Sequence, residues 1–453
     1  EEMCYNIHLK GVDAVKKRIL LICALMAALL LSGCARTIDE LYSPPKRSEE
    51  FSRLQAAIDI AMAGLNYSAP LSGEHQQAVQ MADLDGDGSD EYLVFAKGDS
   101  DKPMQILIFK QRSEDNVEIS EIITSNGSAF ELVQYEDIDG KPGLELVVGR
   151  QVSEQLMGSV SVYSFSSGRA ERLMNAGYSK LLTLDMGGSE QKELLLVQRG
   201  ESEQANAIAV LYRYRAKSMV RSVEVELSRP ANSVKQVTAG KLQCGTQAVF
   251  VSSATEESSI RTDILMLQDE RLRKVPVMGP LLETVQTLSN YYVFAEDVND
   301  DGIMEVPSLI PVRPLVTSWN EVEHHLVRWY SVDKEGMPTD KLHSFHNFSD
   351  GWYLQLERKW ITRLTVNQVG STYAFYMWDE ASEVADPVFT VYALSGSDRK
   401  TQATEDGRFE LQSSADVIYA ARLESAAADY GFDEEYLRTG FHLVHQEWNS
   451  GVT

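Results

Sequence analysis

Short apolar runs recur along the chain from residue 77 onward, each preceded by a polar turn. Four of these runs cover residues 92–95, 146–148, 194–197 and 248–251. The segments around them alternate apolar and polar residues with a period of two, which predicts β-strands. In the first unit we expect strands at 92–96, 105–110, 117–124 and 130–135. The pattern predicts a mainly β fold made of repeated four-stranded units.

The polar turn before the first run is rich in carboxylates. Asp83, Asp85 and Asp87 stand at alternate positions, and Glu91 follows at the start of the next strand. Oxygen ligands at this spacing can converge on one hard cation such as calcium, while Gly88 permits the sharp turn. The turn therefore predicts a calcium loop. The alternative is an acidic surface turn that binds no metal.

A second turn of the same type lies near residue 300. Its ligand positions hold Asp297, Asn299, Asp301 and Glu305, at the same offsets as in the first loop. Asparagine offers an amide oxygen in place of the second carboxylate, so a cation could still be held. We therefore expect calcium here too, in a structural role in which each loop ties the start of one unit to its neighbour.

Weaker copies of the loop lie between these two. The first of them keeps the acids Asp137, Asp139 and Glu145 but has Lys141 at the third ligand position. The lysine removes one ligand, so metal binding is less strongly predicted for this copy.

Two further copies are more degenerate. One keeps only the first and last acids, Asp185 and Glu193, and the other, residues 239–247, keeps no acid. The five copies begin at positions 83, 137, 185, 239 and 297, so the spacings are 54, 48, 54 and 58 residues. A period of this size, with strands in every copy, is typical of a β-propeller.

At these loops the chain resembles the FG-GAP/VCBS repeat family of calcium-loop propellers, and in particular the repeat-containing lipoproteins of Gram-positive bacteria. The resemblance covers residues 77–348 and is most specific at the first and fifth loops. It implies a β-propeller with calcium in some blade loops, used for adhesion and ligand binding, and it implies no reaction. Five loops predict five blades, and six or seven remain possible if other copies have diverged.

Closure of the propeller is expected to involve the strand before the first loop. The fifth unit offers three strands, and its fourth is missing. The strand predicted at 77–81 has no unit of its own. Pairing it with the fifth unit would remove exposed sheet edges, so we expect it to complete the last blade.

The N-terminal segment reads as a bacterial secretion signal. A basic stretch at 16–18 precedes an apolar run at 19–31, and the sequence Leu31-Ser-Gly-Cys34 ends it. We expect residues 1–33 to be a signal peptide, with 1–14 preceding the true start. The resemblance to lipoproteins implies a diacylglycerol thioether, with palmitate-type chains, on Cys34. The alternative is an ordinary signal peptide that happens to end in cysteine.

The mature chain is expected to begin with a spacer. Residues 34–47 contain two prolines and no periodic apolar pattern, which is typical of a tether. Residues 48–76 are predicted to contain an amphipathic helix and a lead-in to the repeats. Phe51, Leu54 and Ile58 recur at helical spacing and form its apolar face.

The repeat pattern ends near residue 348, and residues 349–453 are expected to form a small α+β domain. Strands are predicted at 352–357, 364–369, 373–378, 388–394, 408–412 and 417–423, and a helix at 426–439. The aromatic residues of this region either fill its core or line a sugar-binding face, and core packing is the preferred interpretation.

Charge and cysteine content restrict the partners. The net charge of −25 argues against nucleic acid as a ligand, since phosphate binding needs clustered Lys and Arg. Of the four cysteines, two lie in the predicted signal segment, which leaves Cys34 and Cys244. No disulfide framework is therefore expected, and Cys244 is predicted to be a buried apolar residue.

No motif for catalysis was found, and no catalytic residue is predicted. The chain lacks a phosphate-binding glycine loop, a His-Glu-x-x-His helix and a nucleophile elbow. The sequence therefore favours a lipid-anchored binding or scaffold module on the outer face of the cell membrane, with an unknown protein or glycan partner. The alternatives are a carbohydrate-active enzyme, such as a polysaccharide lyase or hydrolase acting on the propeller face, and a sensor subunit.

Overall fold

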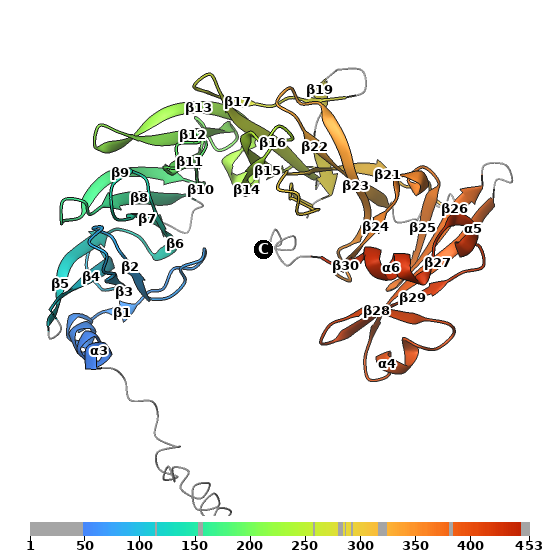
Figure 1. Cartoon of the computed structure of the whole chain (residues 1–453), viewed down its shortest axis with the longest axis horizontal. Helices are drawn as coiled ribbons and strands as arrows, with labels where there is room; N and C mark the ends of the chain where they lie inside the picture. The colour runs from blue at the N-terminus through green and yellow to red at the C-terminus, as the bar shows by residue number, and fades with distance from the viewer. Residues whose placement is uncertain are drawn as a thin grey trace, which may run out of the picture. The chain divides into compact units, whose positions relative to one another are not determined.

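The computed structural model describes residues 49–113, 116–152, 157–256, 259–279, 284–285, 287–290, 293–315, 324–379 and 384–444. They form mainly antiparallel β-sheets that follow one another along the chain (Figure 1). The chain divides into two compact units. One contains helix α3 (Glu49–Ala61) and segment Gln111–Glu118, and the other contains the remaining residues from Met62 onward.

Several predictions for the N-terminal segment concern residues that the structure does not describe. The predicted signal peptide, Cys34 and the tether are not among the described residues. Helix α3 confirms the predicted amphipathic helix, because Leu54 and Ile58 of the expected apolar face are buried while Ile60 is exposed. Within the described part of the chain, no helix is long and apolar enough to cross a membrane.

Sheets one to four share one plan, an antiparallel run of four consecutive strands. Sheets one and two contain β2 (Val79–Ala82), β3 (Glu91–Lys97), β4 (Met104–Ser113), β5 (Asn116–Ser125), β6 (Ala129–Glu136), β7 (Glu145–Gln151), β8 (Gly158–Ser164) and β9 (Glu171–Tyr178). Sheets three and four contain β10 (Lys180–Leu184), β11 (Glu193–Gln198), β12 (Asn206–Arg215), β13 (Ser218–Pro230), β14 (Val234–Lys241), β15 (Gln247–Ala254), β16 (Ser259–Gln268) and β17 (Arg271–Lys274).

Three short elements add to these sheets. Strand β1 (Asn66–Tyr67) pairs with β3, and β20 (Leu288–Asn290) pairs with β16. Strands β18 (Val277–Met278) and β19 (Thr284–Val285) form a separate hairpin. A 3₁₀ turn, η1 (Ala231–Ser233), joins sheets three and four.

Sheet five has the order β21-β22-β23-β24-β30, and an isolated bridge between Glu296 and Glu305 precedes β21. Its strands are β21 (Val306–Pro311), β22 (His325–Val332), β23 (Pro338–Asn347), β24 (Trp352–Leu356) and β30 (Phe441–Leu443). Sheet six has the order β25-β26-β27-β29-β28. Its strands are β25 (Leu364–Val369), β26 (Thr372–Asp379), β27 (Val384–Ser395), β28 (Phe409–Ser413) and β29 (Val417–Leu423).

Short helical segments accompany the last two sheets. They are η2 (Arg358–Trp360), α4 (Arg399–Gln402), α5 (Ala427–Tyr430) and α6 (Glu434–Gly440).

Each central strand is buried on both faces, which explains the continuous apolar runs of the sequence. In β11, Leu194 and Leu196 belong to a core shared with sheet two, while Leu195 and Val197 belong to a core shared with sheet four. Side chains alternate between the faces of a strand, so a run without polar interruption serves two neighbours at once. Each sheet therefore packs between the preceding and the following one.

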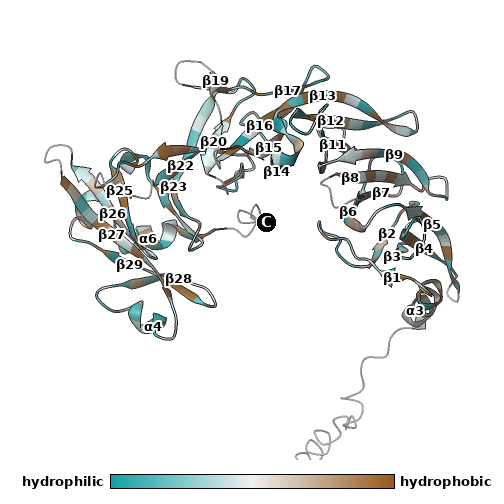
Figure 2. Cartoon of the chain, turned by 180° about the vertical axis from the view of Figure 1, so that it is seen from behind, coloured by the Kyte–Doolittle hydropathy of each residue, from teal (hydrophilic) through white to brown (hydrophobic). Residues whose placement is uncertain are grey.

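The same arrangement continues along the chain. Separate apolar cores join sheets one and two, two and three, three and four, four and five, and five and six. Figure 2 shows hydrophobic residues recurring along the strands of these sheets. Since burying one large apolar side chain contributes about 1.5–3 kcal/mol, these shared cores are the main source of cohesion between successive sheets.

The strands were predicted well, but their grouping was wrong by one strand. The strand expected at 130–135 as the last of the first unit is β6, which opens sheet two. The first strand of sheet one is β2, which pairs with β3. The expected closing strand at 77–81 therefore does not complete the fifth sheet. The first three acidic loops accordingly join the first two strands of one sheet rather than two units, and the fifth loop directly precedes β21.

The C-terminal region also differs from expectation. Strand β24 pairs with β23, so the sheet that begins in the repeats continues past residue 348. The helix predicted at 426–439 is two short helices, because Gly431 adopts φ 82° and ends α5. Cys244 is exposed rather than buried, since it lies in the β14–β15 turn.

Candidate metal centres

The acidic loops occupy equivalent hairpins in four of the five loop-bearing sheets. In the first three, the first acid follows the first strand of the sheet and the closing glutamate begins the second strand. In sheet five, Asp297 follows the bridge residue Glu296, and Glu305 directly precedes the first strand, β21. These glutamates are Glu91, Glu145, Glu193 and Glu305, and all four are buried. The fourth copy has the shorter turn 242–246 and begins β15 with Gln247. The loops that recur at regular spacing in the sequence thus recur at equivalent places in successive sheets.

The first acid of each loop holds the turn together through backbone amides. Asp83 accepts N–H groups from Gly86 at 2.8 Å and Gly88 at 3.0 Å. Asp297 accepts from Asp301 at 3.0 Å and Gly302 at 2.7 Å. These hydrogen bonds are charge-assisted, because each acceptor is a carboxylate.

The closing glutamates share one hydrogen bond. One carboxylate oxygen, Oε2, accepts the amide of the second loop residue in every acidic copy. The distances are 2.9 Å for Leu84 to Glu91, 2.8 Å for Ile138 to Glu145, 3.1 Å for Met186 to Glu193 and 3.2 Å for Val298 to Glu305. Each glutamate side chain therefore binds the backbone of its own loop through Oε2. Its other oxygen, Oε1, takes no part in this hydrogen bond.

Successive loops are also joined to each other. The amide of Leu144 in the second loop donates to the carbonyl of Asp83 in the first at 3.0 Å, and Lys192 donates to Asp137 at 2.7 Å in the same way. Gly86 lies so close to Pro142 that an added Cβ would sit 2.4 Å from its backbone. The loops of sheets one to three therefore form a connected row.

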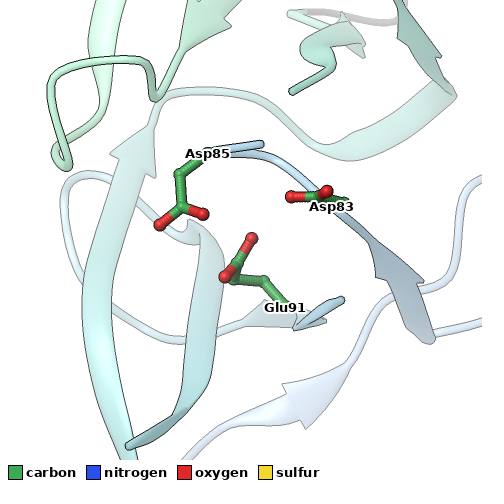
Figure 3. Close-up of side chains that lie close together, drawn as sticks. All are labelled: Asp83, Asp85 and Glu91. Atoms are coloured by element: carbon green, nitrogen blue, oxygen red, sulfur yellow. The ribbon is translucent and has the colours of Figure 1, made fainter. Parts of the chain in front are cut away.

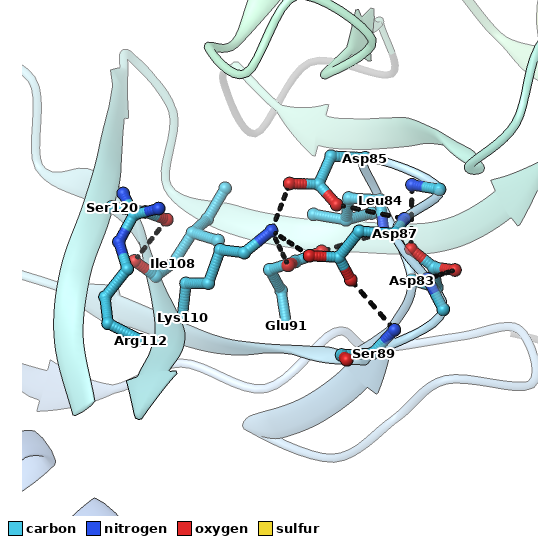
Figure 4. Close-up of polar contacts among 12 residues, drawn as sticks. Asp83, Leu84, Asp85, Asp87, Ser89, Glu91, Ile108, Lys110, Arg112 and Ser120 are labelled. Atoms are coloured by element: carbon cyan, nitrogen blue, oxygen red, sulfur yellow. Dashed lines mark hydrogen bonds and ion pairs between the residues drawn. The ribbon is translucent and has the colours of Figure 1, made fainter. Parts of the chain in front are cut away.

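The first loop gathers the carboxylates that the sequence predicted. Single oxygens of Asp83, Asp85 and Glu91 lie within 4.8 Å of one another, and Figure 3 shows the three groups close together. A feature that was not predicted lies among them. Lys110, from β4, forms ion pairs with Asp85, with Asp87 at 2.7 Å and with Glu91 at 3.2 Å (Figure 4).

The ammonium group of Lys110 alters the electrostatics of this loop. Burial alone would lower the pKa of Lys110, but its hydrogen bonds to Asp85 and Asp87 and its ion pair with Glu91 raise it above the ordinary value. The same hydrogen bond lowers the pKa of Asp87. A positive charge from the chain thus already lies where a cation would meet these oxygens.

The second loop brings together Asp137, Asp139 and Glu145, again within 4.8 Å. Lys141, at the third ligand position, turns back and forms an ion pair with Asp139. Burial raises the pKa of Glu145, although hydrogen bonds partly oppose this. The lysine identified in the sequence as a lost ligand therefore contributes a cation of its own.

The third loop is closed by an arginine. Arg213, from β12, contacts Glu193 at 2.5 Å and Glu270 at 2.6 Å. Arg213 occupies the same place in sheet three as Lys110 does in sheet one. Lys110 directly follows Phe109, the partner of Tyr92 in β3, and Arg213 directly follows Tyr212, the partner of Leu194 in β11.

The fifth loop lacks such a cation at its buried end. Asn299 donates to Asp301 at 3.2 Å, and Lys341 from β23 contacts Asp301 at 2.8 Å at the partly exposed side. Glu305 is 0% exposed, and its Oε1 has no hydrogen-bond partner. Burial, followed by the nearby acids, raises the pKa of Glu305 to about 7. The donor set and the unsatisfied buried oxygen fit a divalent cation.

A pocket of about 330 Å³ lies beside the fifth loop. It is lined by Asp297 and Asn299 from the loop together with Trp329, Tyr353 and His442 from sheet five. The loop oxygens are thus accessible from a recess that also carries aromatic side chains. The lining combines the acidic loop with the rings of Trp329 and Tyr353, so the recess is mainly polar and carries negative charge.

The predicted metal ligands are therefore only partly brought together. The acids of the first and second loops cluster as expected. Those of the fifth loop form the expected turn, but among the described residues they are not grouped within 4.8 Å of one another. Sequence reasoning missed Lys110 and Arg213. The sequence does contain a signal for them. Each is a basic residue directly after the apolar part of the strand that pairs with the buried central strand, β3 or β11.

Comparisons with known proteins name no family. No family model matches the chain, and no curated protein matches it. Among solved structures, it is similar to a protein from Lactobacillus plantarum at 11% identity and a TM-score of 0.31, over 70% of this chain and 85% of the other. It is similar to a putative 6-phosphogluconolactonase from Bacteroides fragilis at 9% identity and a TM-score of 0.29, over 71% and 92%. For Sqt1 from Saccharomyces cerevisiae the values are 10%, 0.30, 78% and 86%. Similarity at this level assigns neither activity nor ligand.

Proposed function

We propose that this protein is a lipid-anchored binding module on the extracytoplasmic face of the cell membrane, built on a β-propeller of FG-GAP/VCBS type. Calcium in the acidic loops stabilises this scaffold. The observation that carries the proposal is the connected row of loops, in which Leu144 and Lys192 donate to the carbonyls of Asp83 and Asp137. The carboxylates hold backbone amides of their own turn, and the backbone carbonyls of Asp83 and Asp137 hold the next loop, which is a structural role.

The propeller assignment rests on the packing of successive sheets. Sheets one to five each begin at a loop hairpin and share an apolar core with the next sheet in the chain. We assign these five sheets as the blades, and sheet six with its helices to the C-terminal domain. This domain shares a large aromatic core with sheet five, which includes Phe345, Trp352 and Phe375.

The membrane anchor rests on the sequence Leu31-Ser-Gly-Cys34. Growth of the host with an alkyne fatty acid, followed by capture of the labelled protein, tests it. The wild type should be labelled and sediment with membranes, while Cys34→Ser should be unlabelled and not anchored. Equal labelling of both proteins would contradict the anchor.

The ligand site that the geometry favours is the pocket beside the fifth loop, and the ligand is a protein or a glycan. The test is a pull-down from membranes together with a glycan array, both carried out in calcium. The half-buried Gln355 lines the pocket, so Gln355→Trp should fill it and abolish retention of the captured partner. Gln151→Trp, at an exposed position of β7, is the matched control. Equal retention by both variants would contradict this placement.

The array also separates binding from catalysis. A binding module retains its glycan unchanged, whereas an enzyme releases shortened or unsaturated products. Detection of product by mass spectrometry would contradict the proposed function.

A further inference from the structure

The four acidic loops differ in what meets the second oxygen of the closing glutamate. The first oxygen makes the same bond to a loop amide in all four. At the second oxygen, the first loop has the ammonium of Lys110 at 3.2 Å from Glu91, and the third has the guanidinium of Arg213 at 2.5 Å from Glu193. Among the described residues, Oε1 of Glu305 in the fifth loop has neither an ion pair nor a hydrogen-bond partner, whereas Oε1 of Glu91 has the ion pair with Lys110 and no hydrogen bond.

The strand register shows why. Tyr92 pairs with Phe109, so the next residues, Glu91 and Lys110, are opposite each other. The same step in sheet three sets Glu193 opposite Arg213, since Leu194 pairs with Tyr212.

In sheet five the residue at this position is a serine. Val306 pairs with Tyr330, which sets Glu305 opposite Ser331. Ser331 is 0% exposed, and its hydroxyl oxygen has no hydrogen-bond partner. Two buried polar groups with unsatisfied oxygens thus stand together at the inner end of the fifth loop. Leaving such groups unpaired costs on the order of 1–3 kcal/mol each, and more for a charged group.

The lysine near the fifth loop does not replace a cation at this place. Lys341 forms its ion pair with Asp301, whose side chain is partly exposed. Among the described residues, no ion pair links a basic side chain to Glu305.

In the second loop the residue opposite Glu145 is also a serine, Ser164, since Leu146 pairs with Tyr163, and its hydroxyl donates to Asp139 at 3.5 Å. The charge there comes from within the loop, where Lys141 forms an ion pair with Asp139.

We propose that Lys110, Lys141 and Arg213 are built-in cations that take the place of a metal ion in loops one to three, and that the fifth loop alone recruits a divalent cation from solution. The fifth site uses Asp297, Asn299, Asp301 and Glu305, with Ser331 leaving room for the ion. The inference deepens the proposed calcium role and does not depend on the anchor or on the ligand. It assigns the metal to one of two loops that have nearly the same sequence.

The test is calcium and terbium binding to the purified full chain. Trp329 lines the same pocket as Asp297, so terbium in the fifth loop should emit when tryptophan is excited. The matched variants are Asp83→Asn and Asp297→Asn, which change the first position of each loop. Calorimetry should find one calcium per wild-type chain, with a Kd on the order of 10⁻⁴–10⁻³ M as in extracellular sites.

Asp83→Asn should bind calcium with unchanged stoichiometry and affinity. Asp297→Asn should lose at least tenfold in affinity, together with the terbium emission. Two calcium ions per wild-type chain, or loss of binding in Asp83→Asn, would overturn the assignment while leaving the proposed calcium role intact. No binding by the wild type would overturn both.

A second variant tests the built-in cation directly. Lys110→Ser recreates in the first loop the residue pair of the fifth, so it should bind one further calcium ion that Asp83→Asn removes again. Lys110→Ser with only one calcium would overturn the role of Lys110. If Lys110→Ser does not fold, the reverse change Asp301→Lys should place an amine in the fifth loop and abolish calcium binding, and retained binding would overturn the proposal.

Discussion

The first and fifth loops are nearly the same in sequence and differ in structure. Both place acids at alternate positions, a glycine in the turn and a buried glutamate at the end. The first loop closes around Lys110 of the same chain, whereas among the described residues no basic side chain pairs with Glu305 at the buried end of the fifth loop. On the proposal above, the residue across the sheet and the loop's own residues together decide whether a loop needs a metal.

The largest expected effect comes from removing the charge in the first loop. Lys110→Met keeps the stem of the side chain and leaves three acids without their partner. Breaking a buried pair typically costs about 3–5 kcal/mol, and the partial exposure of Asp85 and Asp87 reduces this to roughly 2–3 kcal/mol. Urea unfolding with a chelator present measures the loss, and added calcium should restore part of it. Unchanged stability would show that the ion pairs contribute little.

Calcium should have the next largest effect, and only through the fifth loop. Ligand at about 100 times its Kd stabilises a folded protein by about 2.7 kcal/mol. Thermal melts with about 10 mM calcium, against a chelator, should show this gain for the wild type and for Asp83→Asn. Asp297→Asn should not gain stability. Equal gains in both variants would remove the distinction between the loops.

Sheets one and five, which carry the first and fifth loops, should also differ in how their stability changes with acid. Strands β2–β5 contain no histidine, whereas His346 in β23 stacks on Tyr353 and contacts Ser344 at 2.8 Å. Burial lowers the pKa of His346 from 6.5 to about 3, so the folded protein keeps this ring neutral. The unfolded chain binds the proton below its ordinary pKa, and stability therefore falls as the pH drops from 6.5 toward 3.

The size of this loss follows from the proton taken up on unfolding, about 2 kcal/mol between pH 6.5 and roughly pH 4.5. His346→Phe should remove that part of the pH dependence while the contribution of the carboxylates remains. Parallel pH profiles of wild type and variant, measured by urea unfolding, would contradict the neutral histidine.

The smallest effect is expected from the lysine of the fifth loop. Lys341 pairs with Asp301 near the surface, and exposed pairs contribute about 0–1 kcal/mol. Lys341→Met should therefore cost much less than Lys110→Met in urea unfolding, and it should leave calcium binding intact. Losses of equal size would show that the two lysines have the same role.

Much of this arrangement could be predicted from the sequence. The apolar runs predicted the central strands, and the spacing of the loops predicted the positions of the five turns, although each turn was expected to join two units. These signals are local, because a strand alternates with period two and a turn needs its own glycine and acids.

The rest depends on pairing between distant residues. The sequence pattern cannot show that β6 is the first strand of sheet two. The same alternation of apolar and polar residues would fit β6 as the last strand of sheet one, until its pairing partner is known. Lys110 lies far along the chain from Asp83, so its place among the loop acids follows only from the register of β3 and β4. The break in the C-terminal helix was readable at Gly431, and the apolar pattern around it outweighed that signal in the prediction.

The most direct test of this account is a crystal structure grown with a lanthanide or calcium and measured for anomalous scattering. We predict one strong peak among the oxygens of Asp297, Asn299 and Glu305, with the amine of Lys110 still seated between Asp85, Asp87 and Glu91. A peak of comparable height in the first loop, with Lys110 turned away, would contradict the claim that the chain supplies its own cation there.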